Sequence, residues 1–200
     1  MKKRVGLLGG TFDPVHNGHC KIARSFISSG YIDELWILLT PYPPHKQEGN
    51  YVDYNTRLKM LQAAFREDKK IRISTVENEL PKPSYTINTI LELKKNHPDT
   101  LFYFCLGEDS LEQFDKWKYF DRILDEVKLL AAQRPGATHK NVNSQVSERS
   151  LFIEHEPFNI SSSEVREKVL KGESIEDLVP VEVKKVIYEK GVYKDVSLDT

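Results

Sequence analysis

Two histidines near the start of the chain are the first residues whose types and spacing could do chemistry. His16 and His19 lie three residues apart and follow the glycine-rich segment 9–11. Glycines directly after the apolar run 5–8 would let backbone N–H groups approach a phosphate closely. Imidazoles three apart at a helix start share one face, where they could stabilise the charge on a transferring phosphoryl group.

Other interpretations of this segment stay open at this point. Gly9 and Gly10 could form a simple turn, and Asp13 with His16 and His19 could bind a metal ion. The glycines do not follow the dinucleotide-binding pattern G-x-G-x-x-G, and the chain has no G-x-x-x-x-G-K-[ST] loop. The sequence therefore disfavours a P-loop kinase or ATPase.

A second polar group lies near the end of the chain, in the segment 160–166. Ser161 and Glu164 fit the S-x-x-E capping box, which explains these two residues by helix capping alone. Capping does not need the further hydroxyls of Ser162 and Ser163 or the guanidinium of Arg166. Free amides, hydroxyls and a guanidinium at a helix start would bind a polyphosphate well.

The histidine segment and the segment 160–166 must be positioned by the strands and helices around them. Strands are expected at 5–8, 35–39, 71–73, 101–106, 127–132 and 151–153. Helices are expected at 18–29, 57–65, 84–95 and 181–188, after residue 107 through 123, and from 160 to 170. Strands that alternate with helices predict an α/β fold with a doubly wound parallel sheet. Ligands bind such sheets beyond the carboxyl ends of the strands, where the chemically suggestive groups of this sequence lie.

The sequence predicts a single domain over residues 1–200. Its last part, about 160–193, is expected to form a C-terminal helical portion, and 196–200 a frayed tail. Ser84 is a candidate N-cap for the helix that follows it. Residues 137–149 are polar and lack periodicity, which predicts a long mobile loop.

Composition narrows the class of protein further. The 200 residues are 39% hydrophobic, which is ordinary for a globular protein, and their net charge of −1 argues against a broad nucleic-acid or membrane surface. Cys20 and Cys105 are too few for a disulfide framework and are expected to be buried thiols. No stretch reaches the ~18 apolar residues of a membrane span, so a cytoplasmic protein is expected.

The motifs together resemble a known family. G-G-T-F-D-P-V-H-N-G-H at 9–19 and I-S-S-S-E-V-R at 160–166 resemble the paired signatures of the nucleotidyltransferase superfamily with the H-x-G-H motif. Four middle segments make the chain similar to bacterial nicotinate mononucleotide adenylyltransferases: 43–46, 84–89, 107–117 and 134–136. The resemblance spans about residues 3 to 193.

The resemblance implies a Rossmann-like fold and a reaction of NAD biosynthesis. ATP and nicotinate mononucleotide would give nicotinate adenine dinucleotide and pyrophosphate, with Mg²⁺ bridging the ATP phosphates. The implied ATP-binding residues are Gly9, Gly10, Thr11, His16, His19, Asp109, Ser162, Ser163 and Arg166, with His16 and His19 as the catalytic pair. The implied acceptor-binding residues are Lys46, Tyr85, Thr86, Trp117 and Arg134.

The chain departs from the family pattern at two single residues and one dipeptide. Glu108 stands where a small residue is common, Ser163 replaces a threonine, and Lys82-Pro83 replaces a stretch that often carries arginine and glycine. Several implied roles also have structural alternatives. Trp117 could belong to the core, Tyr85 and Thr86 could be a first helical turn, and Asp109 could cap a helix.

Competing functions remain on the sequence alone. The acceptor could instead be nicotinamide mononucleotide or phosphopantetheine, or the chain could be a non-catalytic nucleotide-binding module. A class I aminoacyl-tRNA synthetase is disfavoured, because the chain is short and lacks a K-M-S-K-S segment. For an adenylyltransferase, no general base is required, since an acceptor phosphate with a second pKa of about 6 is already ionised at neutral pH.

Overall fold

The computed structural model of the chain describes residues 2–41, 52–138, 141–156 and 159–194. These residues group into two compact units. The first, here called the sheet unit, comprises 1–10, 22–40 and 70–157; the second, here called the motif unit, comprises 11–21, 41–69 and 158–200. The single domain expected over 1–200 stays a prediction.

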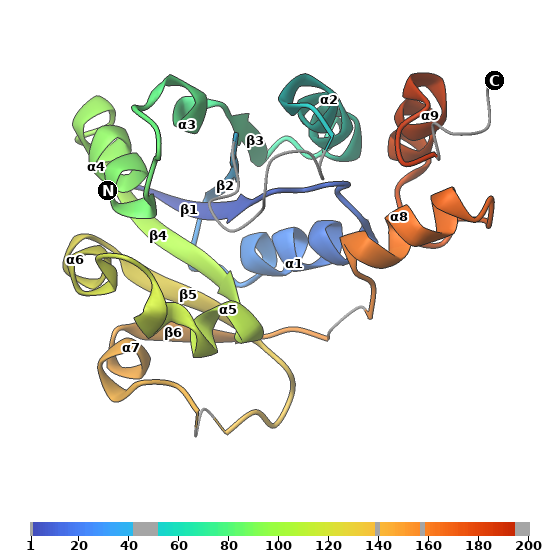
Figure 1. Cartoon of the computed structure of the whole chain (residues 1–200). Helices are drawn as coiled ribbons and strands as arrows, with labels where there is room; N and C mark the ends of the chain where they lie inside the picture. Colours follow the sequence, from blue (N-terminus) through green and yellow to red (C-terminus); the bar gives the residue numbers. More distant parts are fainter. Residues whose placement is uncertain (1, 42–51, 139–140, 157–158, 195–200) are drawn as a thin grey trace. The chain divides into compact units, whose positions relative to one another are not determined.

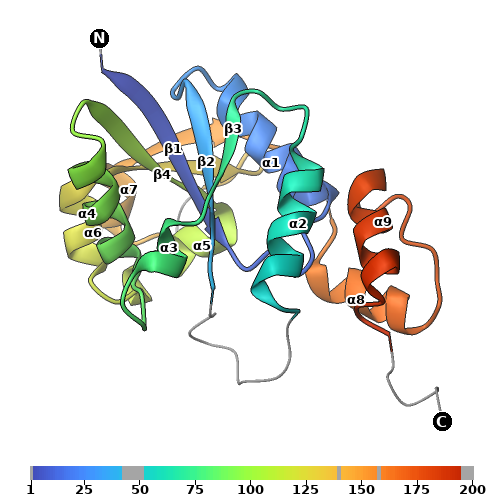
Figure 2. The same cartoon turned by 90° about the horizontal axis from the view of Figure 1, so that it is seen from above.

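The described part of the sheet unit contains a six-stranded sheet (Figures 1 and 2). Its strands are β1 (Lys3–Gly10), β2 (Glu34–Leu39), β3 (Ile71–Ser74), β4 (Thr100–Gly107), β5 (Lys128–Gln133) and β6 (Ser150–Glu154). All pairings are parallel, in the order β3-β2-β1-β4-β5-β6. The predicted α/β fold is confirmed, and the strand order reverses between β1 and β4, where such sheets bind ligands.

Helices cover both faces of this sheet. The sheet unit holds α3 (Val76–Glu79), α4 (Thr86–Asn96), α5 (Glu108–Glu112), the 3₁₀ turn η1 (Phe114–Lys116), α6 (Phe120–Glu126) and α7 (Ser144–Glu148). Helix α1 (Asn17–Ser28) contributes its residues 22–28 to the same unit. Alternation along the strands directs Leu7 toward the core beneath α4 and α6, and Gly6 toward the opposite face.

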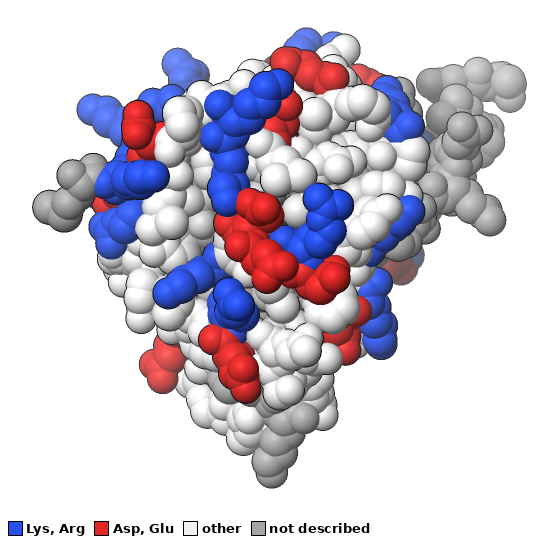
Figure 3. All heavy atoms as spheres, turned by 90° about the vertical axis from the view of Figure 1, so that its left-hand side faces the viewer, with Lys and Arg blue, Asp and Glu red and all other residues white. Residues whose placement is uncertain are grey.

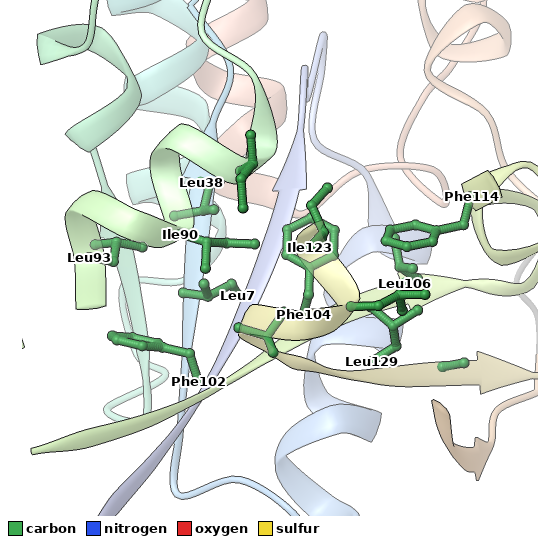
Figure 4. Packing of buried hydrophobic residues seen from close by; sticks show 14 of the residues in the cluster. Leu7, Leu38, Ile90, Leu93, Phe102, Phe104, Leu106, Phe114, Ile123 and Leu129 are labelled. Atoms are coloured by element: carbon green, nitrogen blue, oxygen red, sulfur yellow. The ribbon is translucent and has the colours of Figure 1, made fainter. Parts of the chain in front are cut away.

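The main hydrophobic core of the sheet unit lies between the strands and the helices α4, α6 and α7 (Figure 4). Strand residues meet side chains from α4, α6 and η1 there, and the labelled members are almost fully buried. They are Leu7, Leu38, Ile90, Leu93, Phe102, Phe104, Leu106, Phe114, Ile123 and Leu129. This core fixes the strand ends at which several candidate site residues lie.

The motif unit is built from helices and loops. It contains the first turn of α1 together with α2 (Tyr54–Ala64), α8 (Ser162–Leu170) and α9 (Val181–Lys190). Helices α2 and α9 lie side by side in Figures 1 and 2. Met60 and Leu61 of α2 and Val183 and Ile187 of α9 are fully buried, so apolar packing holds the two helices together.

Two sequence-based predictions about local structure are wrong. Residues 144–148 form α7 rather than part of a mobile loop, because Asn143 caps the helix and Val146 is fully buried. One buried apolar residue in five gives no visible periodicity. Ser84 does not cap α4, whose N-cap is Tyr85, and the Ser84 hydroxyl is buried without a hydrogen-bond partner in the described structure. The tail 196–200 lies outside the described residues.

The distribution of charged side chains and the burial of the cysteines agree with what the composition predicted. On the face drawn in Figure 3, basic and acidic side chains are interspersed. Within the sheet unit, Lys94 of α4 pairs with Glu126 of α6 at 2.5 Å. Cys20 and Cys105 are both buried and unbridged, as expected. Among the helices of the described residues, none is long and apolar enough to cross a membrane.

Gly6 is the point where the sheet tolerates a side chain least. A Cβ there would lie 2.6 Å from Ile32 Cδ1, 2.8 Å from Cys105 Sγ and 3.0 Å from Leu35 Cδ1. These three side chains are buried, so they have no space into which to move. Gly6→Ala should lower the free energy of unfolding by about 1–3 kcal/mol in urea denaturation.

Gly9 in the same strand provides the matched control. A Cβ at Gly9 would lie 3.9 Å from Phe104 Cζ, which is an ordinary contact distance. Gly9→Ala should therefore leave the urea midpoint close to that of the wild type. Equal losses of stability in the two variants would contradict the packing described for Gly6.

Candidate active site

The segment 11–16, here called the motif loop, joins β1 to α1 and is held through its own carbonyl oxygens. The donors are side chains from α2 and α8, which belong to the same motif unit. Arg57 Nη1 donates to Thr11 O at 2.8 Å, Arg166 Nη1 to Asp13 O at 2.7 Å, and Ser162 Oγ to Pro14 O at 3.0 Å. Helix α8 therefore contacts the loop that carries His16.

Arg57 is the most buried of these donors, with no exposed surface. Besides its bond to Thr11, its Nε donates to Val52 O at 2.9 Å and its Nη2 to Pro41 O at 3.0 Å. A buried charge is tolerated only when hydrogen bonds compensate for its lost hydration. The guanidinium thus ties three backbone segments of the motif unit to one another.

His16 and His19 cap the start of α1 reciprocally. The His16 Nδ1 accepts from the His19 backbone N–H at 3.4 Å, and the His19 Nδ1 accepts from the His16 backbone N–H at 3.3 Å. The rings stack with centroids 3.7 Å apart and an interplanar angle of 27°. This is the pattern of a capping box built from two imidazoles. Because each Nδ1 is an acceptor, each neutral ring carries its proton on Nε2.

Burial keeps the histidine pair neutral. Desolvation lowers the pKa of His16 to about 4. Desolvation, with a smaller contribution from repulsion by His16, lowers the pKa of His19 to about 3. The Phe12 ring lies edge-on to His19 with centroids 5.0 Å apart. At neutral pH the pair therefore offers two Nε2–H donors without a net charge, which suits binding of phosphate oxygens by hydrogen bonds.

The start of α8 combines capping with contacts to the motif loop. Ser161 Oγ accepts from the Glu164 N–H at 3.1 Å, which confirms the capping interpretation for Ser161. Ser162 and Arg166 instead bind the motif loop, as described above. Arg166 Nη2 also donates to Ser163 Oγ at 3.1 Å, so this hydroxyl helps to orient the guanidinium.

The alternative of a metal site at Asp13, His16 and His19 finds no support in the geometry. In the part of the chain that the structure describes, no three His, Cys, Asp or Glu side chains are grouped as metal ligands. Asp13 Oδ1 accepts from the Tyr193 hydroxyl at 2.6 Å, and the two histidine Nδ1 atoms accept from backbone N–H groups. Asp13 Oδ2, in contrast, is buried without a hydrogen-bond partner among the described residues.

Further candidates lie at the carboxyl ends of strands in the sheet unit. Gly10 ends β1, Asp109 lies in the first turn of α5 after β4, and Arg134 directly follows β5. These strands are neighbours, so the three positions share one edge of the sheet. Glu108 Oε2 accepts from the Arg134 backbone N–H at 3.4 Å and lies 3.7 Å from Arg134 Nε. The unusual glutamate thus positions a predicted anion-binding residue.

Trp117 could belong to the core or bind the acceptor, and its surroundings have features of both. Its ring packs against Phe104 and Phe114, with centroids 5.9 and 5.3 Å away, and it borders the main core. The residue nevertheless stays partly exposed, so one part of the indole remains available to a ligand. Whether this surface binds a pyridine ring stays a prediction.

Tyr85 and Thr86 form the start of α4, as the first-turn interpretation expected. The Lys118 ammonium lies 4.3 Å from the centre of the Tyr85 ring and 3.1 Å from its hydroxyl. A positive charge therefore lies beside this helix start. The segment that contains Lys46, with Pro43, Pro44 and His45, lies outside the described residues.

Sequence reasoning missed two residues that hold the motif loop. Arg57 was assigned only to a helix, although its spacing from the buried Met60, Leu61 and Ala64 places it on the buried side of α2. Tyr193 follows α9 in a segment with no motif and no periodicity, so nothing in the sequence pointed to its contact with Asp13.

The parallel sheet and the histidine pair at a helix start agree with the nucleotidyltransferase class that the motifs of the sequence resemble. A sequence model of the family described as cytidylyltransferase-like matches residues 7–168. A protein named probable nicotinate-nucleotide adenylyltransferase from Halalkalibacterium halodurans is 37% identical over 96% of this chain and 92% of its own length. The nicotinate-nucleotide adenylyltransferase of Bacillus subtilis (strain 168) is 33% identical over 96% of this chain and 99% of its own length.

The chain belongs to the nicotinate-nucleotide adenylyltransferase family. Its fold also resembles that of the Plasmodium falciparum nicotinic acid mononucleotide adenylyltransferase complexed with NaAD. The TM-score is 0.78 with 19% sequence identity, and the match covers 96% of this chain and 97% of the other. At this identity the likeness concerns the fold, and it agrees with the six-stranded parallel sheet.

The lowered histidine pKa values predict that stability falls in acid. An unfolded histidine has the ordinary pKa of 6.5, so below this pH the unfolded chain binds more protons than the folded one. The contribution of the pair is therefore complete above pH 6.5 and is lost as pH falls toward 4. Between pH 7 and 5 the loss should be about 1–2 kcal/mol per histidine.

Urea denaturation of wild type and His16→Asn at both pH values measures this effect. Asparagine accepts well at an N-cap, so the variant keeps the capping role without the titration. Its free energy of unfolding should fall less between pH 7 and 5 than that of the wild type. The same fall in both proteins would contradict the buried, neutral state of His16.

Proposed function

We propose that the protein transfers the AMP unit of ATP to nicotinate mononucleotide, giving nicotinate adenine dinucleotide and pyrophosphate in NAD biosynthesis. One observation carries the chemical part of this proposal: the histidine pair and the start of α8 converge on one loop, held by Arg166 and Ser162. The names of the relatives support nicotinate mononucleotide as the acceptor. The same features argue against a binding-only module, which would not need two donor imidazoles.

The reaction needs alignment and charge stabilisation rather than a base. An oxygen of the acceptor phosphate forms a bond to the α-phosphorus, and the bond from that phosphorus to the bridging oxygen of the β-phosphate breaks. The electron pair leaves with pyrophosphate. The acceptor phosphate is already ionised at neutral pH, since its second pKa is about 6. The Nε2–H groups of His16 and His19 stabilise the charge shared by the oxygens of the α-phosphate.

The β- and γ-phosphates bind at the start of α8. Ser162, Ser163 and Arg166 hold the β- and γ-phosphates, which become the leaving group. In the free protein two Arg166 nitrogens already donate to Asp13 O and Ser163 Oγ, which fixes the plane of the guanidinium. Its other N–H groups then meet phosphate oxygens with little loss of side-chain freedom. Gly9, Gly10 and Thr11 line the nucleotide.

The sheet unit supplies the groups for adenosine and the acceptor. Asp109 binds the adenosine ribose, and Trp117 stacks on the pyridine ring. Tyr85 and Thr86 place the ring carboxylate at the start of α4, where no described side chain caps the helix and the nearby Lys118 favours an anion. Arg134, oriented by Glu108, binds phosphate. The sequence-based role of Lys46 in phosphate binding belongs to the same proposal.

The metal ion arrives with the nucleotide. Mg²⁺ keeps much of its water and binds chiefly through substrate phosphates in such sites, so no dedicated cluster of side-chain ligands is required. Mg²⁺–ATP is thus the substrate, in a cytoplasmic reaction that involves neither a nucleic acid nor a membrane.

An acceptor screen with purified protein tests the proposed function. Pyrophosphate release is measured with Mg²⁺–ATP and, separately, nicotinate mononucleotide, nicotinamide mononucleotide or phosphopantetheine. We expect release with nicotinate mononucleotide to be fastest, because the ring carboxylate adds a charged contact that the amide lacks. His19→Ala is the impaired control, with turnover reduced far more than ATP affinity.

Two results would overturn parts of this assignment. A clear preference for the amide or for phosphopantetheine would refute the acceptor. Absence of release with all three acceptors would instead favour a non-catalytic nucleotide-binding module.

A further inference from the structure

Tyr193 reaches the motif loop from the far end of the chain. It follows α9, which ends at Gly191 in the left-handed region with φ 60°. Tyr193 itself has φ 66°, a conformation that is uncommon for a bulky residue and that persists when the surroundings hold it. Its hydroxyl donates to Asp13 Oδ1 at 2.6 Å across 180 positions of sequence.

Asp13 is fixed at both its side chain and its main chain. Its side chain is buried, and Oδ1 accepts from Tyr193 and, at 3.4 Å, from the Val52 backbone N–H. Its backbone carbonyl accepts from Arg166 at 2.7 Å. The hydroxyl of Tyr193 and the guanidinium of Arg166 therefore hold one residue from two sides, three positions before His16.

The Tyr193 hydroxyl remains a donor in this setting. Burial, followed by repulsion from the Asp13 carboxylate, raises the pKa of Tyr193 above its ordinary value. Hydrogen bonds to a buried carboxylate are stronger than those between neutral groups. Removing this donor would leave the Asp13 carboxylate with fewer hydrogen bonds in a buried site, and the motif loop would be free to shift.

We infer that Tyr193 is a positioning residue for AMP transfer, because through Asp13 it fixes the motif loop that aligns His16 and His19 with the α-phosphate. This role rests on the proposed function of the histidine pair. Tyr193 does not touch the reacting atoms. It acts on the alignment of the two Nε2–H donors, which matters most in the transition state.

Kinetics of Tyr193→Phe test this role, because phenylalanine removes only the hydroxyl. We expect kcat to fall about tenfold, since misalignment costs more in the transition state than in substrate binding. The KM values for ATP and for the acceptor should stay within about twofold. Assays are run well below the melting temperatures of both proteins. An unchanged kcat would overturn the proposal.

Tyr188→Phe is the matched control. Tyr188 lies in α9, the helix that Tyr193 follows, and is 45% exposed, so its hydroxyl has no comparable buried contact to lose. Its kcat and KM should equal those of the wild type. An equal fall in kcat for both variants would show a general effect of this helix and would refute the specific role of Tyr193.

A double-mutant cycle with Asp13→Asn tests the route through Asp13. If the hydroxyl acts through this carboxylate, Tyr193→Phe should lower kcat less in the Asp13→Asn background than in the wild type. Equal fold-changes in the two backgrounds would show that Tyr193 acts elsewhere and would overturn the inference.

Nitrogen NMR of ¹⁵N-labelled histidine tests the same idea without any acceptor. The wild type should show protonated Nε2 and unprotonated Nδ1 for His16 and His19, and Tyr193→Phe should shift these signals toward tautomer exchange. Unchanged spectra would refute the positioning role. A wild type that uses none of the acceptors would refute the proposed function, while these spectra would still decide the role of Tyr193.

Discussion

The motif loop has three backbone carbonyl oxygens that must be satisfied by side chains, and the site depends on this constraint. A loop between a strand and a helix cannot pair these oxygens within regular secondary structure. Arg57, Arg166 and Ser162 supply the donors. Because two of them lie in α8, the same contacts that stabilise the loop also bring the serine-rich helix start beside the histidines. The hydrogen bonds that stabilise the motif loop thus also arrange the groups proposed to bind the triphosphate.

The reciprocal cap of His16 and His19 settles both the protonation and the direction of the imidazoles. Each Nδ1 accepts from a backbone N–H, which leaves each Nε2 as a donor. Burial holds both rings neutral, so the free protein avoids placing two positive charges 3.7 Å apart. The site is therefore arranged before the substrate binds.

Sequence patterns predicted the strands well, because each buried parallel strand is a short apolar run. The patterns could not show how the motif loop is held. Arg57 binds a carbonyl 46 positions away, and Tyr193 binds Asp13 across 180 positions. Such contacts depend on tertiary packing and leave no local periodicity. Helix α7 was missed for a related reason, since its single buried Val146 is invisible as a pattern.

A crystal structure with Mg²⁺ and a non-hydrolysable ATP analogue tests the central claim most directly. The account predicts that the Nε2 atoms of His16 and His19 and the guanidinium of Arg166 lie within hydrogen-bond distance of oxygens of the same triphosphate. The carbonyls of the motif loop should keep their side-chain donors in this complex. A triphosphate bound by the histidines with Arg166 and the start of α8 directed elsewhere would contradict the account.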